Sequence, residues 1–204
     1  MEHSGGLLEQ AGNSAGIQSV QNLEAVINEG LRVALLEETP DQSLEVLLEH
    51  LGKALKGERT YIFEQNESGG DDNTYEWVAG GVEPEKESLQ NVPPESLEDI
   101  RESDPLQYEN LKRQGIHSLV VVPLYDGKKI IGFYGVDNPP VRSLEYTSNM
   151  LQTAAYFIVS SLKRRNLVRE LQKRSYKILH ALSVDYLGIY QVNFDTGDCE
   201  VYRS

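Results

Sequence analysis

The sequence is poor in cysteine and in long apolar runs. Cys199 is the single cysteine among 204 residues, so neither a disulfide framework nor a zinc site with paired Cys and His ligands can be assembled. No run approaches the roughly 18 apolar residues that cross a bilayer, and no basic segment followed by an apolar run stands at the N-terminus. We therefore expect a cytoplasmic chain with no membrane partner.

Basic residues are also scarce in the first half of the chain. Residues 1–110 hold 24 acidic and 6 basic residues, residues 111–204 hold 8 and 13, and the net charge is −13. An acidic balance repels phosphate groups, so no nucleic-acid partner is expected. The seven basic residues between Lys163 and Lys177 predict either an anion-binding patch or a solvated helix face, and the second is the commoner case.

Helical spacing of apolar residues dominates the N-terminal part. Residues 1–19 mix Gly, Ser, Gln and Asn and predict a mobile tail. An amphipathic helix is predicted from Leu23 to about Glu38, and a second one from an Asp41 N-cap to Gly57. Two helices should therefore precede any strand.

Two β-hairpins are predicted after these helices, because short segments rich in aromatic and β-branched residues flank turn sequences. The predicted strands are Thr60–Glu64, Asn73–Ala79, His117–Leu124 and Lys129–Asp137. A long acidic connection with short helices near residues 94–101 and 104–114 should join the hairpins, and a connection of this length is usually functional or a lid. Strand alternation puts Tyr75 and Trp77 on one face and Glu76 on the other, where we expect a solvent or edge position.

A long helical pattern follows. From Ser143 to about Leu182 no Gly or Pro interrupts it, which predicts a connector of the coiled-coil type. Its first half carries a stripe that we expect to form the contacts of a parallel homodimer: Leu151, Ala155, Ile158 and Leu162. The spacing breaks between Leu162 and Val168, which indicates a stutter or a change of partner face. After Ser183 a hairpin is predicted, and two strands do not fold alone.

Several of these segments together carry a resemblance to a known family. They are TYIFE, NTYEW, IHSLVVVPLYDGKKIIGFYGVDNPP and the helix after Leu144. The strand ending in Val-Pro-Leu, followed by a tight turn and Ile-Gly-Phe-Tyr-Gly-Val, is the most specific part. The region resembles a GAF domain, a small ligand-sensing module, of the variety found ahead of GGDEF-type cyclases, sensor kinases and related regulators. The tail from about His180 is similar to the opening of a PAS domain.

The resemblance implies an α+β fold, in which a GAF-like antiparallel sheet is joined by N-terminal helices and a long C-terminal connector helix. It also implies a ligand pocket on one face of the sheet, beneath the long connection. The expected domains are a tail (1–19), a GAF-like sensor domain (20–162), a helical connector (163–182) and the first hairpin of a truncated PAS-like domain (183–204).

The sequence shows no catalytic constellation and no spacing of histidines that suggests a metal site. A GAF-type sulfoxide reductase or a bilin-binding GAF domain would need a pocket cysteine, and the Asn-Lys-Phe-Asp-Glu signature of cyclic-nucleotide binders is absent. The pocket candidates are Tyr75, Trp77, His117 and Tyr134; core packing is the alternative for the aromatic residues, and a structural hydrogen bond for His117. These residues do not indicate a particular cofactor.

We expect a non-catalytic sensory and dimerisation module of a signal-transduction protein, in which a small-molecule ligand biases the helical connector. The first alternative is a purely structural dimerisation module whose pocket is filled by side chains. A GAF-fold enzyme is the second alternative and is disfavoured by the cysteine count. The missing downstream output domain could be a cyclase, a kinase or a phosphodiesterase.

Overall fold

The computed structural model describes residues 23–93, 111, 115–140, 148–186, 188–192 and 199–203. The chain divides into two compact units, Met1–Leu162 and Lys163–Ser204. The predicted tail over residues 1–19, the predicted helices near 94–101 and 104–114, and the predicted start of the connector at Ser143 lie outside the described residues. Among the helices described, none combines the length and apolar content that a membrane span requires.

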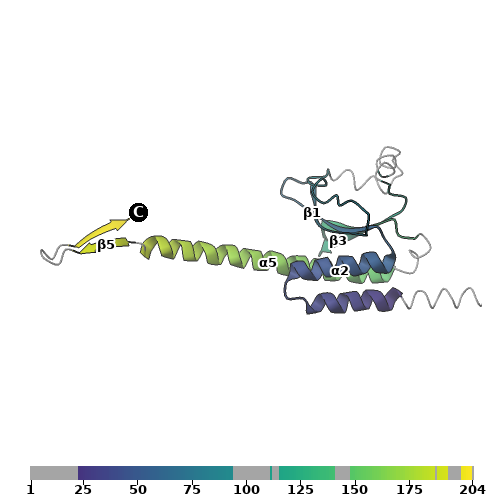
Figure 1. Cartoon of the computed structure of the whole chain (residues 1–204), viewed down its shortest axis with the longest axis horizontal. Helices are drawn as coiled ribbons and strands as arrows, with labels where there is room; N and C mark the ends of the chain where they lie inside the picture. The colour runs from purple at the N-terminus through teal and green to yellow at the C-terminus, as the bar shows by residue number, and fades with distance from the viewer. Residues whose placement is uncertain are drawn as a thin grey trace, which may run out of the picture. The chain divides into compact units, whose positions relative to one another are not determined.

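Two antiparallel helical segments open the first unit, as Figure 1 shows: residues 23–36 and α2 (Pro40–Leu55). The predicted Asp41 N-cap is wrong. Thr39 caps α2 instead, because its side chain accepts a hydrogen bond from the Gln42 amide while the Gln42 side chain accepts one from the Thr39 amide. Pro40 then occupies the first helical turn, where its missing N–H costs nothing.

The first unit contains a four-stranded antiparallel sheet in the order β2-β1-β4-β3. Its strands are β1 (Arg59–Gln65), β2 (Asp71–Val78), β3 (Leu119–Asp126) and β4 (Lys129–Asp137). The two hairpins therefore meet along β1 and β4, which form the centre of the sheet. β3 begins two residues later than predicted, because the backbone amides of His117 and Ser118 bond to the Asn138 side chain instead of joining the ladder.

An irregularity in β2 decides which side chains share a face. Ile62 of β1 pairs with Tyr75, whereas the next residue, Phe63, pairs with Asn73, so Thr74 is an extra residue without a cross-strand partner in the described sheet. Asn73 therefore lies on the same face as Phe63, and Glu76 lies on that face opposite Tyr61.

The two faces of the sheet are covered differently (Figure 1). α2 and the first part of α5 (Ser148–Tyr186) pack on one face and enclose the main core. A second cluster, formed by Tyr61, Phe63 and Phe133, lies on the other face beneath Leu89 and Val92 of the connection. We call this second face the open face, because no helix of the described residues covers it. The predicted α+β fold with an antiparallel sheet, N-terminal helices and a long C-terminal helix is confirmed.

The first part of α5 belongs to the core of the first unit. The residues predicted to form the dimer contact are at most 8% exposed there: Leu151, Ala155, Ile158 and Leu162. The core of the single chain therefore already buries the stripe that was predicted to form the dimer contact, which gives that prediction no support.

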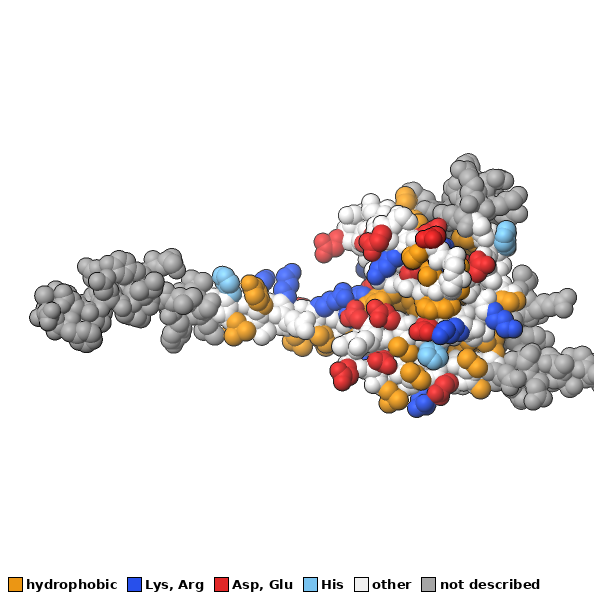
Figure 2. Space-filling model, viewed as in Figure 1, with side chains coloured by type: hydrophobic (Ala, Val, Ile, Leu, Met, Phe, Trp, Pro, Cys, Tyr) orange, Lys and Arg blue, Asp and Glu red, His pale blue; other side chains and the backbone are white. Residues whose placement is uncertain are grey.

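The second unit is described on its own. It holds the rest of α5 and a hairpin of β5 (Gly188–Val192) and β6 (Cys199–Arg203), which pair as a two-stranded antiparallel sheet. Hydrophobic side chains are exposed on this part of α5, where Figure 2 shows orange patches. The exposed large apolar residues are Leu167, Val168, Leu171, Ile178 and Leu179.

Candidate functional site

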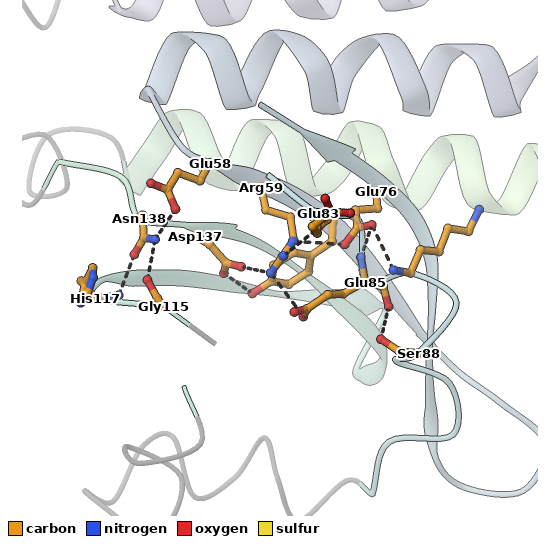
Figure 3. A network of polar contacts seen from close by, with 12 residues as sticks. Glu58, Arg59, Glu76, Glu83, Glu85, Ser88, Gly115, His117, Asp137 and Asn138 are labelled. Carbon is orange, nitrogen blue, oxygen red and sulfur yellow. Dashed lines mark hydrogen bonds and ion pairs between the residues drawn. The ribbon is translucent and has the colours of Figure 1, made fainter. Parts of the chain in front are cut away.

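A buried guanidinium organises the open face (Figure 3). Arg59 begins β1, and its Nη1 lies 3.2 Å from Asp137 Oδ2 and 3.4 Å from Glu85 Oε2. Its Nε lies 3.3 Å from Glu76 Oε1, within ion-pair distance although not aligned as a hydrogen bond. Nη2 donates a hydrogen bond to the carbonyl oxygen of Glu83 at 3.0 Å. We call Arg59, Glu76, Glu85 and Asp137 the ion cluster.

The ion cluster holds three carboxylates against one cation in a place with little water. The side chains of Arg59, Glu76 and Asp137 are 8%, 3% and 3% exposed, and that of Glu85 is 28% exposed. A buried charge is tolerated only with close partners, and here one guanidinium serves three acids. Burial is the main cause that raises the pKa of Asp137 to about 6; Tyr61 and Arg59 oppose the rise, and Glu85 adds to it.

Glu76 fixes part of the connection to the sheet. Its Oε2 accepts hydrogen bonds from the backbone amides of Glu85 at 2.9 Å and Lys86 at 3.0 Å. Farther along, the Asn73 amide donates to the Leu89 carbonyl at 3.0 Å, and Asp71 and Val92 exchange two backbone hydrogen bonds of 2.9 and 2.8 Å. We call residues 83–92 the strap, since they run along the β2 edge and cover the open face.

Aromatic rings extend the open face beyond the ion cluster. The Tyr61 hydroxyl donates to Asp137 Oδ1 at 3.0 Å, and burial followed by the nearby Asp137 carboxylate raises its pKa, so the phenol stays neutral. Gly135 lies under the Tyr61 ring, where an added Cβ would stand 2.4 Å from Cε2. Phe63 and Phe133 stack with ring centres 4.7 Å apart. The face is therefore closely filled by its own side chains.

One polar side chain on this face is buried without a partner. Asn73 is 1% exposed, and neither its Oδ1 nor its Nδ2 has a hydrogen-bond partner among the residues that the structure describes. A buried amide of this kind calls for an explanation, because desolvating it without a replacement hydrogen bond is costly.

Asn138 closes the end of the sheet next to the ion cluster. Its Oδ1 accepts from the amides of His117 at 2.6 Å and Ser118 at 3.2 Å. Its Nδ2 donates to Glu58 Oε2 at 2.5 Å and to the carbonyl oxygen of Gly115 at 3.0 Å. One amide side chain therefore ties the starts of β1 and β3 to the end of β4.

Among the described residues, no group of three or more His, Cys, Asp and Glu side chains is arranged to hold a metal ion. The site is thus a closely packed, charged cluster that lies under the strap and next to a layer of aromatic rings.

Comparison with known proteins identifies the family. The model of the GAF domain matches residues 39–162, which is more than half of the chain. The chain belongs to the GAF domain family. This assignment agrees with the sheet order and with the two layers of helices and connection around the sheet.

Relatives of this GAF domain occur in signalling proteins. The methanogenesis regulatory histidine kinase FilI of Methanothrix harundinacea (strain 6Ac) is 32% identical over 168 residues, which cover 66% of this chain and 18% of that kinase. The chain thus spans less than a fifth of this relative. It is a GAF domain of the kind found in signalling proteins, with a regulatory histidine kinase among its relatives.

Solved GAF domains share the fold at low sequence identity. The GAF domain of a phosphoenolpyruvate-protein phosphotransferase from Coxiella burnetii has a TM-score of 0.60 at 13% identity, with 74% of this chain and 98% of that chain covered. A domain of a putative two-component sensor histidine kinase from Sinorhizobium meliloti 1021 has a TM-score of 0.52 at 18% identity, with 67% and 99% covered. A phycocyanobilin-bound GAF domain of a cyanobacterial phytochrome has a TM-score of 0.51 at 15% identity, with 74% and 96% covered.

Three of the four predicted pocket residues lie on the helix face of the GAF domain. Tyr75 donates to Asp41 Oδ1 of α2 at 2.6 Å, and Tyr134 donates to the Leu151 carbonyl of α5 at 2.6 Å. The Trp77 ring lies against Gly52 of α2. The prediction that Trp77 faces the connection is therefore wrong, since strand alternation shows which residues share a face but not which layer covers it.

His117 and Glu76 also differ from their predicted positions. The His117 side chain is exposed, and the residue joins the site through its backbone amide, which donates to Asn138 Oδ1. Glu76 lies in the edge strand β2, but its side chain is buried in the ion cluster and does not face solvent.

The hub of the site was missed by the sequence analysis. Arg59 stood outside the predicted strand, which began at Thr60, and Asp137 was interpreted as the end of a strand. The signal lies in the register: Arg59 is the direct cross-strand partner of Asp137. Opposite charges at facing strand ends attract each other, but the pairing of β1 with β4 joins residues 78 positions apart.

Proposed function

We propose that this chain is a non-catalytic sensory and dimerisation module of a cytoplasmic signalling protein, in which the open face of the GAF domain is coupled to an output domain through α5. The membership of the GAF family and the relative among histidine kinases support this function. A change at the ion cluster would act on the output only if it favours one of two states of the helical connector.

The observation that carries the proposal is the position of β4 between the ion cluster and α5. Phe133, Gly135 and Asp137 lie on the open face, and Tyr134 and Val136 alternate with them on the helix face. Tyr134 is fully buried, and its hydroxyl bonds to the Leu151 carbonyl in the early part of α5. A shift of β4 therefore reaches α5 through a direct hydrogen bond.

The connector supplies the dimer contact in this proposal. Leu167, Leu171 and Ile178 are 58%, 56% and 61% exposed in the second unit. Val168, Leu171 and Ile178 are three and seven residues apart, which fits the spacing of a coiled-coil seam, and unlike the buried stripe of the first unit they are exposed. The dimer contact is thus proposed to begin beyond Leu162, where the sequence spacing changes.

The kind of output domain is proposed from the same histidine kinase relative. The relative is a histidine kinase, which favours a kinase, while a cyclase of the GGDEF type or a phosphodiesterase is the alternative. The β5–β6 hairpin is proposed to open a PAS-like domain, because a two-stranded sheet is marginal in isolation.

The coupling can be tested through amide exchange in α5. We expect Asp137→Asn to change the exchange of amides near Leu151, because the substitution alters the end of β4. The same substitution combined with Tyr134→Phe should leave the α5 amides as in Tyr134→Phe alone, since the hydrogen bond that carries the shift is missing. An equal change in both backgrounds would contradict the route through Tyr134.

The structural alternative, a dimerisation module without a small ligand, is favoured by one observation. The open face is filled by its own side chains, with Phe63 stacked on Phe133 and the Tyr61 ring lying on Gly135. In that case Asp137→Asn should change the stability of the domain. After correction for that change in stability, the α5 amides should exchange as they do in the unsubstituted chain.

A further inference from the structure

The strap and β4 compete for the same cation. Arg59 Nη1 stands between Asp137 Oδ2 at 3.2 Å and Glu85 Oε2 at 3.4 Å, so two carboxylates from different elements share one guanidinium nitrogen (Figure 3). Asp137 belongs to the sheet, whereas Glu85 belongs to the strap. Both acids are held close together although they repel each other.

The titratable groups that face Asp137 come from three directions. Arg59 and Tyr61 reach it from β1, Glu85 lies near it in the strap, and Glu76 of β2 meets the same guanidinium. On its own strand the neighbouring residue is Val136, and its partner on β3 is Leu119, neither of which titrates. Only Arg59 among these described groups is a cation.

We propose that Asp137 is a proton-binding site and that the bound proton tightens the strap on the open face. The proton comes from solvent and adds to a carboxylate oxygen of Asp137. The Tyr61 hydroxyl can accept a hydrogen bond as well as donate one, so it can serve the protonated acid. With Asp137 neutral, its repulsion of Glu85 disappears and Arg59 is left to Glu76 and Glu85, which both hold the strap.

The pH range follows from the position of Asp137 in the cluster. Burial raises its pKa to about 6, above the usual 3.8, so the folded state binds the proton more tightly than the unfolded chain does. The stabilisation is therefore fully present below about pH 4 and is lost as the pH rises through 6. The strap should be held tightly at acid pH and more loosely at neutral pH. This inference concerns the strap alone and does not depend on the coupling to α5.

The size of the effect follows from linkage. Release of the strap would expose Asp137 to water and move Glu85 away from it, and both changes lower the pKa of Asp137. A difference of about half to one pKa unit between the held and released strap corresponds to about three- to tenfold in the opening equilibrium.

The amides of Glu85 and Lys86 report the opening directly, because both donate to Glu76 Oε2. Their protection factors, corrected for the intrinsic effect of pH on exchange, should fall about two- to fivefold between pH 5 and pH 7.5 in the complete chain, because the full three- to tenfold difference is reached only below both pKa values. The carboxyl carbon of Asp137, followed by NMR, should titrate with the same midpoint.

Three variants separate the proton site from general effects of charge. Asp137→Asn should abolish the change in protection. Glu85→Gln should lower the midpoint of Asp137, because it removes the repelling carboxylate. Glu67→Gln, at an exposed position in the turn between β1 and β2, removes an equal charge and should leave the titration midpoint of Asp137 unchanged.

The proposal would be overturned by protection factors of Glu85 and Lys86 that do not change with pH, or by a change of equal size in Asp137→Asn. If Asp137→Asn does not fold, Glu85→Gln becomes the deciding variant. An Asp137 titration midpoint that does not fall in Glu85→Gln would contradict the proposal that Asp137 and Glu85 share Arg59. None of these results depends on α5, so a failure here would leave the proposed signalling route standing.

Discussion

At the scale of single residues, the polar groups buried on the open face differ in how completely they are paired. Asp137 has both oxygens engaged, one by Tyr61 and one by Arg59. Glu76 has one oxygen engaged by two amides, and Asn73 has neither of its side-chain atoms paired within the described residues. Because an unpaired buried amide is destabilising, Asn73 is the residue whose replacement should be most informative.

We expect Asn73→Leu to raise the free energy of unfolding by about 1 kcal/mol. Leucine has the same number and branching of side-chain heavy atoms, and it removes two buried polar atoms whose desolvation costs about 1–3 kcal/mol. Urea unfolding followed by circular dichroism measures the change.

Asn66 provides the matched control in the turn of the same hairpin. Its Oδ1 accepts from the amides of Ser68 and Gly70, and its Nδ2 donates to Asp72. Asn66→Leu should therefore lower the stability. If Asn73→Leu lowers the stability by a similar amount, the Asn73 side chain has a hydrogen-bond partner outside the described residues, such as an ordered water molecule.

At the scale of helices and strands, the sequence predicted most elements from their periodicity. β4 was predicted with its observed bounds, and the other strands differ by one or two residues at their ends. The errors concern which elements pack against each other. Strand alternation correctly placed Tyr75 and Trp77 on one face of β2, but it did not show that α2 covers this face. Asn73 is two residues from Tyr75 and would share its face in a regular strand, yet the extra Thr74 turns it to the opposite face.

The contact of α2 with β2 predicts an unusual effect of alanine. In an exposed helix interior, Gly→Ala stabilises by about 1 kcal/mol. At Gly52 the added Cβ would stand 2.3 Å from Cζ3 of Trp77, so we expect Gly52→Ala to destabilise the domain by about 1–3 kcal/mol. Chemical unfolding followed by circular dichroism checks this sign.

Removal of the ring gives the control for this contact. In a Trp77→Leu background, Gly52→Ala should become neutral or stabilising, because the obstructing atoms are gone. A loss of stability that is equal in both backgrounds would show that the ring is not the cause.

At the scale of the whole molecule, one helix serves two environments. α5 is buried over Leu151, Ala155, Ile158 and Leu162 in the first unit, and it exposes Leu171 and Ile178 in the second. Sequence periodicity detects an apolar stripe in both halves but does not say whether the same chain or a second copy covers it. This is why the predicted dimer residues proved to be core residues.

We expect the chain to sediment as a dimer at micromolar concentration, with its contact in the second unit. Leu171→Glu combined with Ile178→Glu should give a folded monomer, because charges replace two seam residues that each contribute roughly 1.5 to 3 kcal/mol when fully buried. Leu151→Ala should instead lower the stability of the GAF domain by about 2–5 kcal/mol, since it opens a cavity in a closed core.

Lys173→Glu is the control for the double substitution, because it makes the net charge more negative by the same two units at an exposed position outside the seam. It should remain dimeric. A monomeric Lys173→Glu would show that charge, and not the apolar seam, governs association; a monomeric unsubstituted chain would remove the basis of the connector proposal.

The extra residue Thr74 also makes one point of β2 tolerant of changes in chain length. Elsewhere in a strand, the loss of one residue exchanges the two faces for every side chain beyond it. Loss of Thr74 would instead leave Asn73 opposite Phe63 and Tyr75 opposite Ile62 in a regular ladder, at the expense of the hydrogen bond from the Thr74 hydroxyl to the Ile62 carbonyl. GAF domains that lack this residue could therefore keep the same residues on the open face and under α2, so an alignment gap at this position would carry no change of architecture.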